Sequence, residues 1–215
     1  MVKMQDIPLF TTEYGAASLV LREIPYRQRA YIHLQASQEP DKLLSECVKF
    51  AKMAGAEEVF ACGNAALEKY PLHAEILRLS RLREGLADTD AALFPVTEET
   101  LEKWRCLYNE RMQDVDQAAF MSMMEAKKML RRKEAYFVHR EEKILGIGVA
   151  GGDTVQAIAS IETGCGKQTL LALNHALSGE KINVEVASTN EKALRLYYAL
   201  GFLPVAVLSQ WYKVI

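Results

Sequence analysis

The sequence has few cysteines and contains no long hydrophobic run. The four cysteines, Cys47, Cys62, Cys106 and Cys165, are scattered without a C-x-x-C pair or nearby histidines. This pattern argues against a zinc site and is typical of a reducing compartment. No stretch of about 18 apolar residues is present, and the first residues lack the features of a signal peptide. We therefore expect a cytoplasmic protein that binds no metal and does not enter a membrane.

The sequence also has no large excess of positive or of negative charge. Lysine and arginine total 26, aspartate and glutamate total 28, and the formal net charge is −2. Such a balance creates no global field that would attract nucleic acid or anionic lipid, so we expect neither partner. Half of the residues are apolar and 25% are charged, as in ordinary globular proteins. A chain of this length buries roughly 70% of its unfolded surface, so it needs no disulfide for stability.

Hydrophobic periodicity divides the chain into two halves. The first half predicts strands at 17–24, 29–34, 58–62 and 75–79, a helix that Pro40 opens and Gly55 ends, and a short helix at 64–70. Residues 83–90 are polar and without a clear period, and we interpret them as a linker. The predicted domains are therefore 1–88 and 92–215.

The second half predicts a strand, two helices, several strands, and then alternating helices and strands. Thr97 is the expected cap of the first helix, whose apolar face carries Leu101, Trp104, Tyr108 and Met112. The remaining expected elements are helices at 114–132, 167–178 and 191–199, strands at 93–96, 135–139, 143–149, 155–161 and 183–186, and a final strand pair. This order indicates a mixed α/β fold.

The two halves share a local pattern. Residues 58–70, a strand followed by a helix that ends in tyrosine, are similar to residues 184–197. A decayed internal duplication would produce this similarity. Chance would also produce it, because helix–strand units recur in α/β proteins.

The most specific motif spans Asn190 to Phe202. Asn190 is a good helix N-cap, Ala193 permits close packing, and Gly201 suits a left-handed C-cap. A structural interpretation explains each of these residues separately, but it gives no reason for their combination.

In this motif the chain resembles the GNAT N-acetyltransferase superfamily. The family pattern N-x-x-A-x-x-L-Y-x-x-x-G-F is met in full, at Asn190, Ala193, Leu196, Tyr197, Gly201 and Phe202. The resemblance covers residues 92–215 and implies the acyl-CoA N-acyltransferase fold, an α/β mixed sheet. Residues 1–88 would then be a smaller, degenerate GNAT-like half without cofactor equipment, because no glycine cradle follows the strand at 29–34.

The resemblance also implies a cofactor site. In the family, acetyl-CoA lies where the fourth strand splays from the fifth, and its pyrophosphate rests on the next helix N-terminus. Here the fourth strand is 155–161, and a short glycine-bearing loop follows it. The implied cofactor-binding residues are Ser160, Ile161, Glu162, Gly164, Cys165, Gly166, Lys167, Gln168, Asn190 and Tyr197.

The cofactor loop departs from the family pattern R/Q-x-x-G-x-G/A. Counting back from Gly164 and Gly166, the Arg/Gln position falls on Ile161, and the loop is shorter than usual. A phosphate-binding P-loop does not fit either. Its first glycine would be Ile161, and Gln168 stands where a serine or threonine must meet magnesium.

Acetyl transfer requires that the amine lose a proton and that the departing thiolate gain one. The resemblance implies Tyr197 as the acid and Glu162 as the base. Alternatively, Tyr197 only packs and hydrogen-bonds the cofactor, and Glu162 is a solvated loop carboxylate. Trp104, Tyr108, Met121 and Met124 line the implied acceptor site unless they are core residues.

Two functions remain open from the sequence. One is an N-acetyltransferase that moves an acetyl group from acetyl-CoA to a primary amine, either a small molecule or a peptide, as a monomer or homodimer. The other is a non-catalytic GNAT-fold module that binds acyl-CoA or a protein partner. The intact motif at 190–202 favours the enzyme, and the altered loop at 161–167 favours the module.

Overall fold

The computed structural model describes residues 6–115, 118 and 120–215, which form two compact units. The first unit comprises the described residues up to Glu75 together with Leu208–Ile215, and the second is Ile76–Val207. No helix in the described ranges is both long and apolar enough to cross a bilayer.

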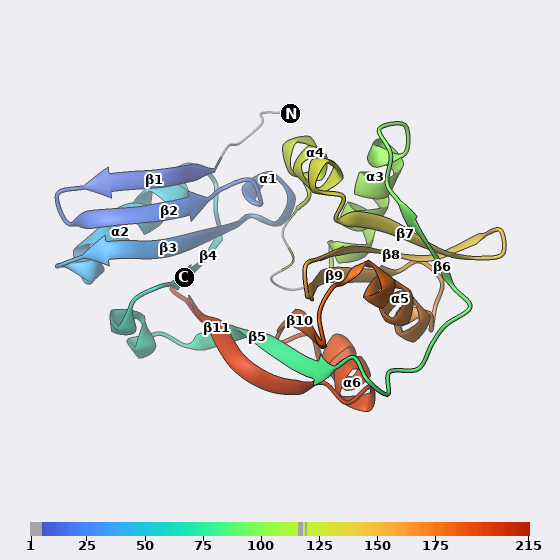
Figure 1. Cartoon of the computed structure of the whole chain (residues 1–215). Coiled ribbons are helices and arrows are strands. Elements are labelled where there is room, and N and C mark those ends of the chain that lie inside the picture. Colours follow the sequence, from blue (N-terminus) through green and yellow to red (C-terminus); the bar gives the residue numbers. More distant parts are fainter. Residues whose placement is uncertain (1–5, 116–117, 119) are drawn as a thin grey trace. The chain divides into compact units, whose positions relative to one another are not determined.

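The first unit is a small sheet packed against one amphipathic helix (Figure 1). Its elements are β1 (Ile7–Thr12), β2 (Gly15–Val20), α1 (Ile24–Arg27), β3 (Arg29–Ser37), α2 (Pro40–Met53), β4 (Glu58–Cys62) and η1 (Ala65–Lys69). Strands β1, β2 and β3 are antiparallel, and β3 is parallel to β4. Leu43, Cys47 and Ala51 share one face of α2 and are fully buried against Ile32 and Val59.

The second unit contains most of the α/β core. Its own elements are β6 (Ala92–Pro95), α3 (Leu101–Met112), α4 (Met123–Arg132), β7 (Ala135–Arg140), β8 (Lys143–Gly151), β9 (Thr154–Ser160), α5 (Gly166–Leu173), η2 (Asn174–Ala176), β10 (Lys181–Ala187) and α6 (Glu191–Ala199). Strands β6 to β9 pair in sequence order and are antiparallel. Strand β10 then adds in parallel to β9.

Two long strands each have residues in both units, namely β5 (Leu72–Leu82) and β11 (Leu203–Lys213). Within the second unit, β5 pairs antiparallel with β10, with Leu79 opposite Val184. Within the first unit, the end of β11 pairs antiparallel with β4, with Tyr212 opposite Ala61. Strand β5, which precedes the linker, therefore adds to the strands of the second unit, and the end of β11, the last strand, adds to those of the first unit.

Two glycines let α5 lie directly on β8. A Cβ at Gly146 would stand 2.4 Å from Oγ1 of Thr169, and one at Gly148 would stand 2.3 Å from Cδ1 of Leu173. Both distances are far below van der Waals contact, so these positions require glycine. The close packing sets the position of α5, and with it the position of the helix N-terminus.

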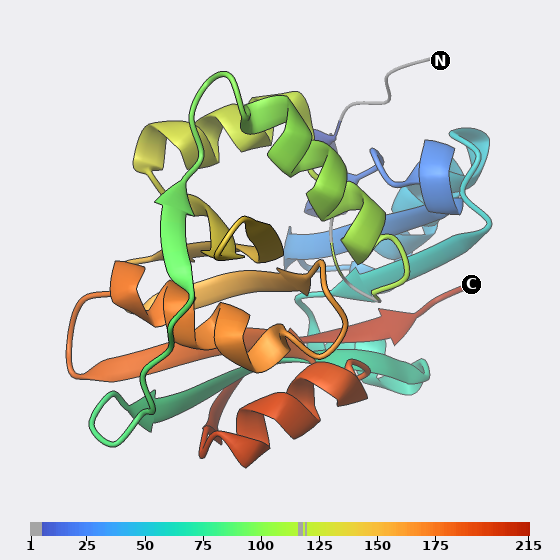
Figure 2. The same cartoon turned by 90° about the vertical axis from the view of Figure 1, so that its right-hand side faces the viewer.

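The opposite face of the sheet is covered by α3 and α4, which lie side by side (Figure 2). Trp104 is fully buried there, and its indole N–H donates to the carbonyl of Tyr136 at 3.1 Å. Helix α4 begins with a capping box between Ser122 and Glu125. The sheet therefore carries α5 and α6 on one face and α3 and α4 on the other.

Most expected elements are confirmed, but several bounds were wrong. The helix expected after Thr97 begins at Leu101, because the Thr97 amide donates to the Thr100 hydroxyl and forms a separate turn. Of the helix expected at 114–132, only α4 from Met123 onward is helical among the described residues; 116, 117 and 119 lie outside them.

The other differences arise where neighbouring elements decide the outcome. The strand expected at 17–24 ends at Val20, and Pro25, expected to separate two strands, does so in the first turn of the short helix α1. The helix expected at 64–70 is the 3₁₀ helix η1, and that expected at 167–178 is α5 followed by η2. The expected final strand pair is the single strand β11, and β1 was not predicted.

Candidate functional site

Strands β9 and β10 separate after two residues of pairing. Their parallel register joins Asn183 to Thr154 and Val184 to Val155. Strand β9 nevertheless stays paired with β8 as far as Ser160. In the described part of the chain, residues 156–160 thus have no ladder partner on the side toward β10. A wedge with unpaired backbone groups opens between the two strands.

A tight turn leads from the end of β9 into α5. The amides of Ile161 and Glu162 both donate to the carbonyl of Leu145, at 2.9 and 3.1 Å. The Cys165 amide then donates to the carbonyl of Glu162 at 3.3 Å. Gly164 adopts φ +84°, which favours glycine, and a Cβ there would meet nothing within 4 Å. Gly164 is therefore an exposed glycine in a turn conformation that it adopts without strain.

The N-terminus of α5 presents amide groups at this turn. The first intrahelical bond runs from the Thr169 amide to the Cys165 carbonyl, at 2.9 Å. The amides of Gly166, Lys167 and Gln168 precede it, so the helix itself cannot satisfy them. Free amides and the helix dipole favour an anion, and the exposed Lys167 adds positive charge.

Gly166 brings three elements together. A Cβ at this position would lie 3.3 Å from Oγ of Ser160 and 3.2 Å from Cδ2 of Leu196. The end of β9, the start of α5 and the middle of α6 therefore meet at Gly166. Among the implied cofactor residues, the structure brings Ser160 and Gly166 into contact distance.

Tyr197 lies in the core on α6, close to these elements. It is 5% exposed, belongs to the same buried cluster as Val155 and Val184, and its ring centroid is 5.9 Å from that of Phe202. Burial raises its pKa to about 12. The hydroxyl is therefore protonated at neutral pH and has a proton to donate.

Asn190 and Glu162 have different surroundings. The Asn190 side chain accepts from the Ala193 amide at 3.1 Å, so it caps α6 as its sequence position predicts. The Glu162 side chain is exposed to solvent. Tyr198, adjacent to Tyr197, is 48% exposed and points away from the core.

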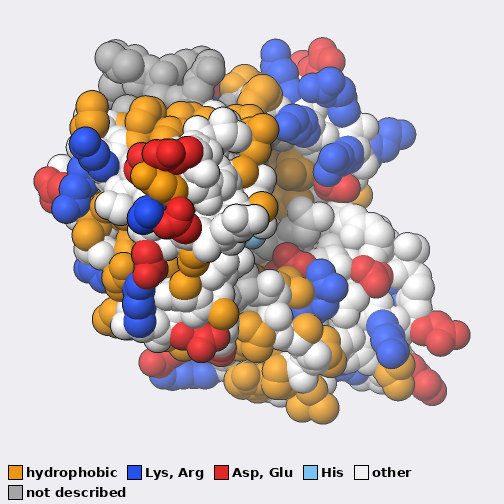
Figure 3. All heavy atoms as spheres, turned by 90° about the vertical axis from the view of Figure 1, so that its left-hand side faces the viewer, with side chains coloured by type: hydrophobic (Ala, Val, Ile, Leu, Met, Phe, Trp, Pro, Cys, Tyr) orange, Lys and Arg blue, Asp and Glu red, His pale blue; other side chains and the backbone are white. Residues whose placement is uncertain are grey.

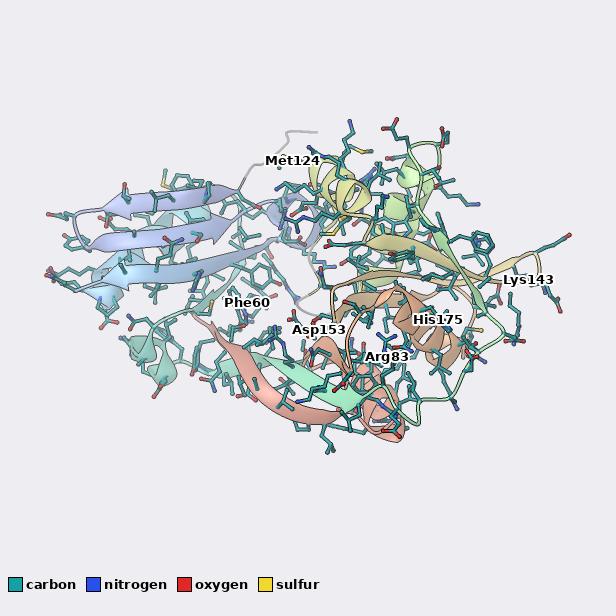
Figure 4. The ribbon with its side chains drawn as sticks, in the orientation of Figure 1. Phe60, Arg83, Met124, Lys143, Asp153 and His175 are labelled. Atoms are coloured by element: carbon teal, nitrogen blue, oxygen red, sulfur yellow. The ribbon has the colours of Figure 1, made fainter. Side chains whose placement is uncertain are left out.

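The expected acceptor-lining residues are mainly core. Trp104, Tyr108 and Met121 are 0, 8 and 7% exposed, within the cluster under α3. Met124 is 64% exposed on α4 (Figure 4). In the described ranges, no group of three or more His, Cys, Asp and Glu side chains is placed to hold a metal ion.

The sequence interpretation did not identify two charged residues beside the wedge. Glu185 follows the last residue of β10 that pairs with β9, and Arg78 lies directly opposite it on β5. The alternation of polar and apolar residues in 182–186 indicates which residues share a face with Glu185. Nothing local in the sequence indicates its partner, because the two residues are 107 positions apart.

The sequence matches no family model and no curated protein. Structure comparison finds similar folds. A GCN5-related N-acetyltransferase from Anabaena variabilis has a TM-score of 0.63 at 10% identity, over 93% of this chain and 59% of the other. A tandem GNAT protein from the clavulanic acid biosynthesis pathway has 0.54 at 12%, over 93% and 78%. A putative acetyltransferase from Pyrococcus horikoshii has 0.56 at 10%, over 94% and 69%. The chain therefore has the GNAT fold.

Proposed function

We propose that this GNAT-fold chain is an N-acetyltransferase that transfers the acetyl group of acetyl-CoA directly to a primary amine. The observation that carries the proposal is the separation of β9 from β10 after Val155 and Val184, with the N-terminal amides of α5 following β9 and with Tyr197 in the same buried cluster as these two valines. A wedge of this kind offers one ligand both a free strand edge and an anion site.

The residues at the wedge fit the chemical parts of acetyl-CoA. The unpaired edge of β9, residues 156–160, offers hydrogen bonds to an extended amide-containing arm. The amides of Gly166, Lys167 and Gln168, with the Lys167 ammonium, offer a site for a pyrophosphate. Acetyl-CoA supplies an acetyl group activated as a thioester.

The proposed reaction needs two proton transfers, one to the departing thiolate and one from the amine. Tyr197 donates the proton of its hydroxyl to the departing thiolate. Its pKa of about 12 keeps the hydroxyl protonated at neutral pH, so the proton is available for this step. Glu162, exposed at the start of the turn that follows β9, is the proposed acceptor of the amine proton.

Calorimetry and a free-thiol assay test this proposal together. We expect acetyl-CoA to bind with micromolar affinity, about −8 kcal/mol, and amines to be acetylated. Tyr197→Phe should bind acetyl-CoA as the parent protein does but lose about 10²-fold or more in kcat. Tyr198→Phe, an exposed hydroxyl on the same helix, is the matched control and should be unaffected. Unchanged kcat in Tyr197→Phe would remove Tyr197 from the reaction.

A second candidate function is a non-catalytic module that binds acyl-CoA or a protein partner. It is favoured by Ile161, which stands where the family pattern has a basic or amide side chain. Binding of acetyl-CoA without turnover of any amine would support this candidate. Absence of binding at millimolar acetyl-CoA would exclude both functions that use the wedge.

We also propose that residues 1–88 are a degenerate copy of the later half and that the protein is cytoplasmic. The strand arrangement supports duplication. In the first half β5 follows β4 and pairs with β10, and in the second half β11 follows β10 and pairs with β4. Each half therefore gives the strand after its equivalent strand to the other half. The face drawn in Figure 3 carries both basic and acidic side chains.

A further inference from the structure

Glu185 lies on the sheet face opposite Tyr197. Its neighbours Val184 and Val186 are buried in the cluster that contains Tyr197, so the intervening side chain points to the other face. That other face is the one that α3 and α4 cover at β8 and β9. Because the wedge opens immediately after Val184, the Glu185 carboxylate lies at its edge.

The carboxylate keeps capacity for another ligand. Nη2 of Arg78 donates to Oε1 of Glu185 at 2.8 Å, and the two side chains are 41 and 32% exposed. Nε of Arg78 is buried and has no acceptor in the described part of the chain. Arg78 and Glu185 are therefore joined by one hydrogen bond and not by the bidentate arrangement of two parallel bonds. A carboxylate has about four acceptor positions, and a single bond leaves the others available.

A second carboxylate lies nearby. Asp153, labelled in Figure 4, lies directly before β9. Its pKa is lowered, chiefly because the Thr154 hydroxyl donates to it and to a lesser extent because of the Arg78 charge. One guanidinium is thus shared electrostatically between two carboxylates. A protonated amine is a chemically suitable further partner for these carboxylates.

We propose that Glu185 binds the protonated amine of the acceptor at the edge of the wedge, and that Arg78 is the residue that positions its carboxylate. The inference rests on the proposed acetyltransferase function and adds to it a binding group for the acceptor. The amine then approaches from the face opposite Tyr197, and the reacting atoms meet in the gap between β9 and β10. Arg78 belongs to β5, so the segment before the linker contributes to the acceptor site.

The test compares Glu185→Gln with two matched variants in a free-thiol assay, using acetyl-CoA with spermidine, tyramine, L-lysine and a lysine-containing peptide as probes. For the probe with the highest kcat/KM, Glu185→Gln should raise its KM about 10–100-fold, since a charge-assisted hydrogen bond is lost, and change kcat less than about threefold. Glu191→Gln breaks a similar ion pair, with Arg195 at 2.7 Å, and should leave KM unchanged. Glu162→Gln should lower kcat instead.

The exchanged double variant Arg78→Glu/Glu185→Arg separates recognition from structure. It keeps an ion pair across the two strands but moves the carboxylate to β5 and places a cation at the edge of the wedge. We expect an unchanged melting temperature, unchanged acetyl-CoA affinity and a raised amine KM. A parental KM in this variant or in Glu185→Gln would overturn the inference and leave the acetyltransferase function standing. Failure of every probe amine with the parent protein would instead overturn the proposed function, and this inference with it.

Discussion

The guanidinium of Arg81 donates a hydrogen bond through Nη1 to the carbonyl of Leu200, 119 residues further along the chain. Leu200 is the C-cap of α6, and a cation at a helix C-terminus is favoured by the helix dipole. Arg81 lies on β5 and also donates to the carbonyls of Leu82 and Glu84. A residue before the linker therefore stabilises the helix that carries Tyr197.

Replacement of Arg81 by alanine should destabilise the second unit. We expect the free energy of unfolding to fall by about 1–3 kcal/mol, because the hydrogen bond from a charged donor to the Leu200 carbonyl is lost. Urea unfolding followed by circular dichroism measures the change. Arg195→Ala removes an arginine from an exposed pair on α6 and should cost less than about 0.5 kcal/mol. Equal losses in the two variants would contradict a special role for Arg81.

Gly148→Ala should force α5 away from β8. The new methyl group would stand 2.3 Å from Leu173 Cδ1 and 2.9 Å from the Ala157 carbonyl oxygen. Such overpacking costs about 1–3 kcal/mol of folding free energy. Thermal unfolding checks the loss, and the double variant with Leu173→Ala should not show the sum of the two single effects. Strict additivity would mean that the two side chains do not meet.

Stability should depend on Tyr197 at alkaline pH. Burial raises the pKa of Tyr197 in the folded state to about 12 from its ordinary value of 10.0, so the folded protein retains this proton after the unfolded chain has lost it. The contribution is fully present below pH 10 and is lost as the pH rises toward 12, by about 2–3 kcal/mol. Denaturant unfolding between these values should show a steeper decline for the parent than for Tyr197→Phe. Parallel curves would show that Tyr197 is not buried as described.

The four thiols should react at different rates in the native protein. Burial raises the pKa of Cys47 to about 11 and that of Cys62 to about 12, which suppresses their thiolates. Cys106 is exposed and Cys165 is partly exposed. A titration with a disulfide reagent at pH 8 should therefore show two accessible thiols before unfolding and four after it. Mass mapping of Cys47 or Cys62 among the early products would refute the burial of that residue.

Local signals predicted the elements near the site well. Helix α6 runs over 191–199 as predicted, with Asn190 as its cap and Gly201 at φ +81° after it. The strands at 135–139 and 58–62 are likewise confirmed, within a residue at each end. Capping, glycine geometry and apolar periodicity act within a few residues, so they can be read from the chain itself.

Local sequence thus predicts most of the element order, the motif on α6 and the glycine turn before α5, but not β1 or the single last strand. The pairing of β5 with β10, the separation of β9 from β10 after Val184 and the position of Arg78 opposite Glu185 are visible only in the folded chain. Strand partners and the point at which two strands separate depend on contacts between distant segments. Local patterning specifies which face of a strand is buried, but it does not specify the neighbour that completes it.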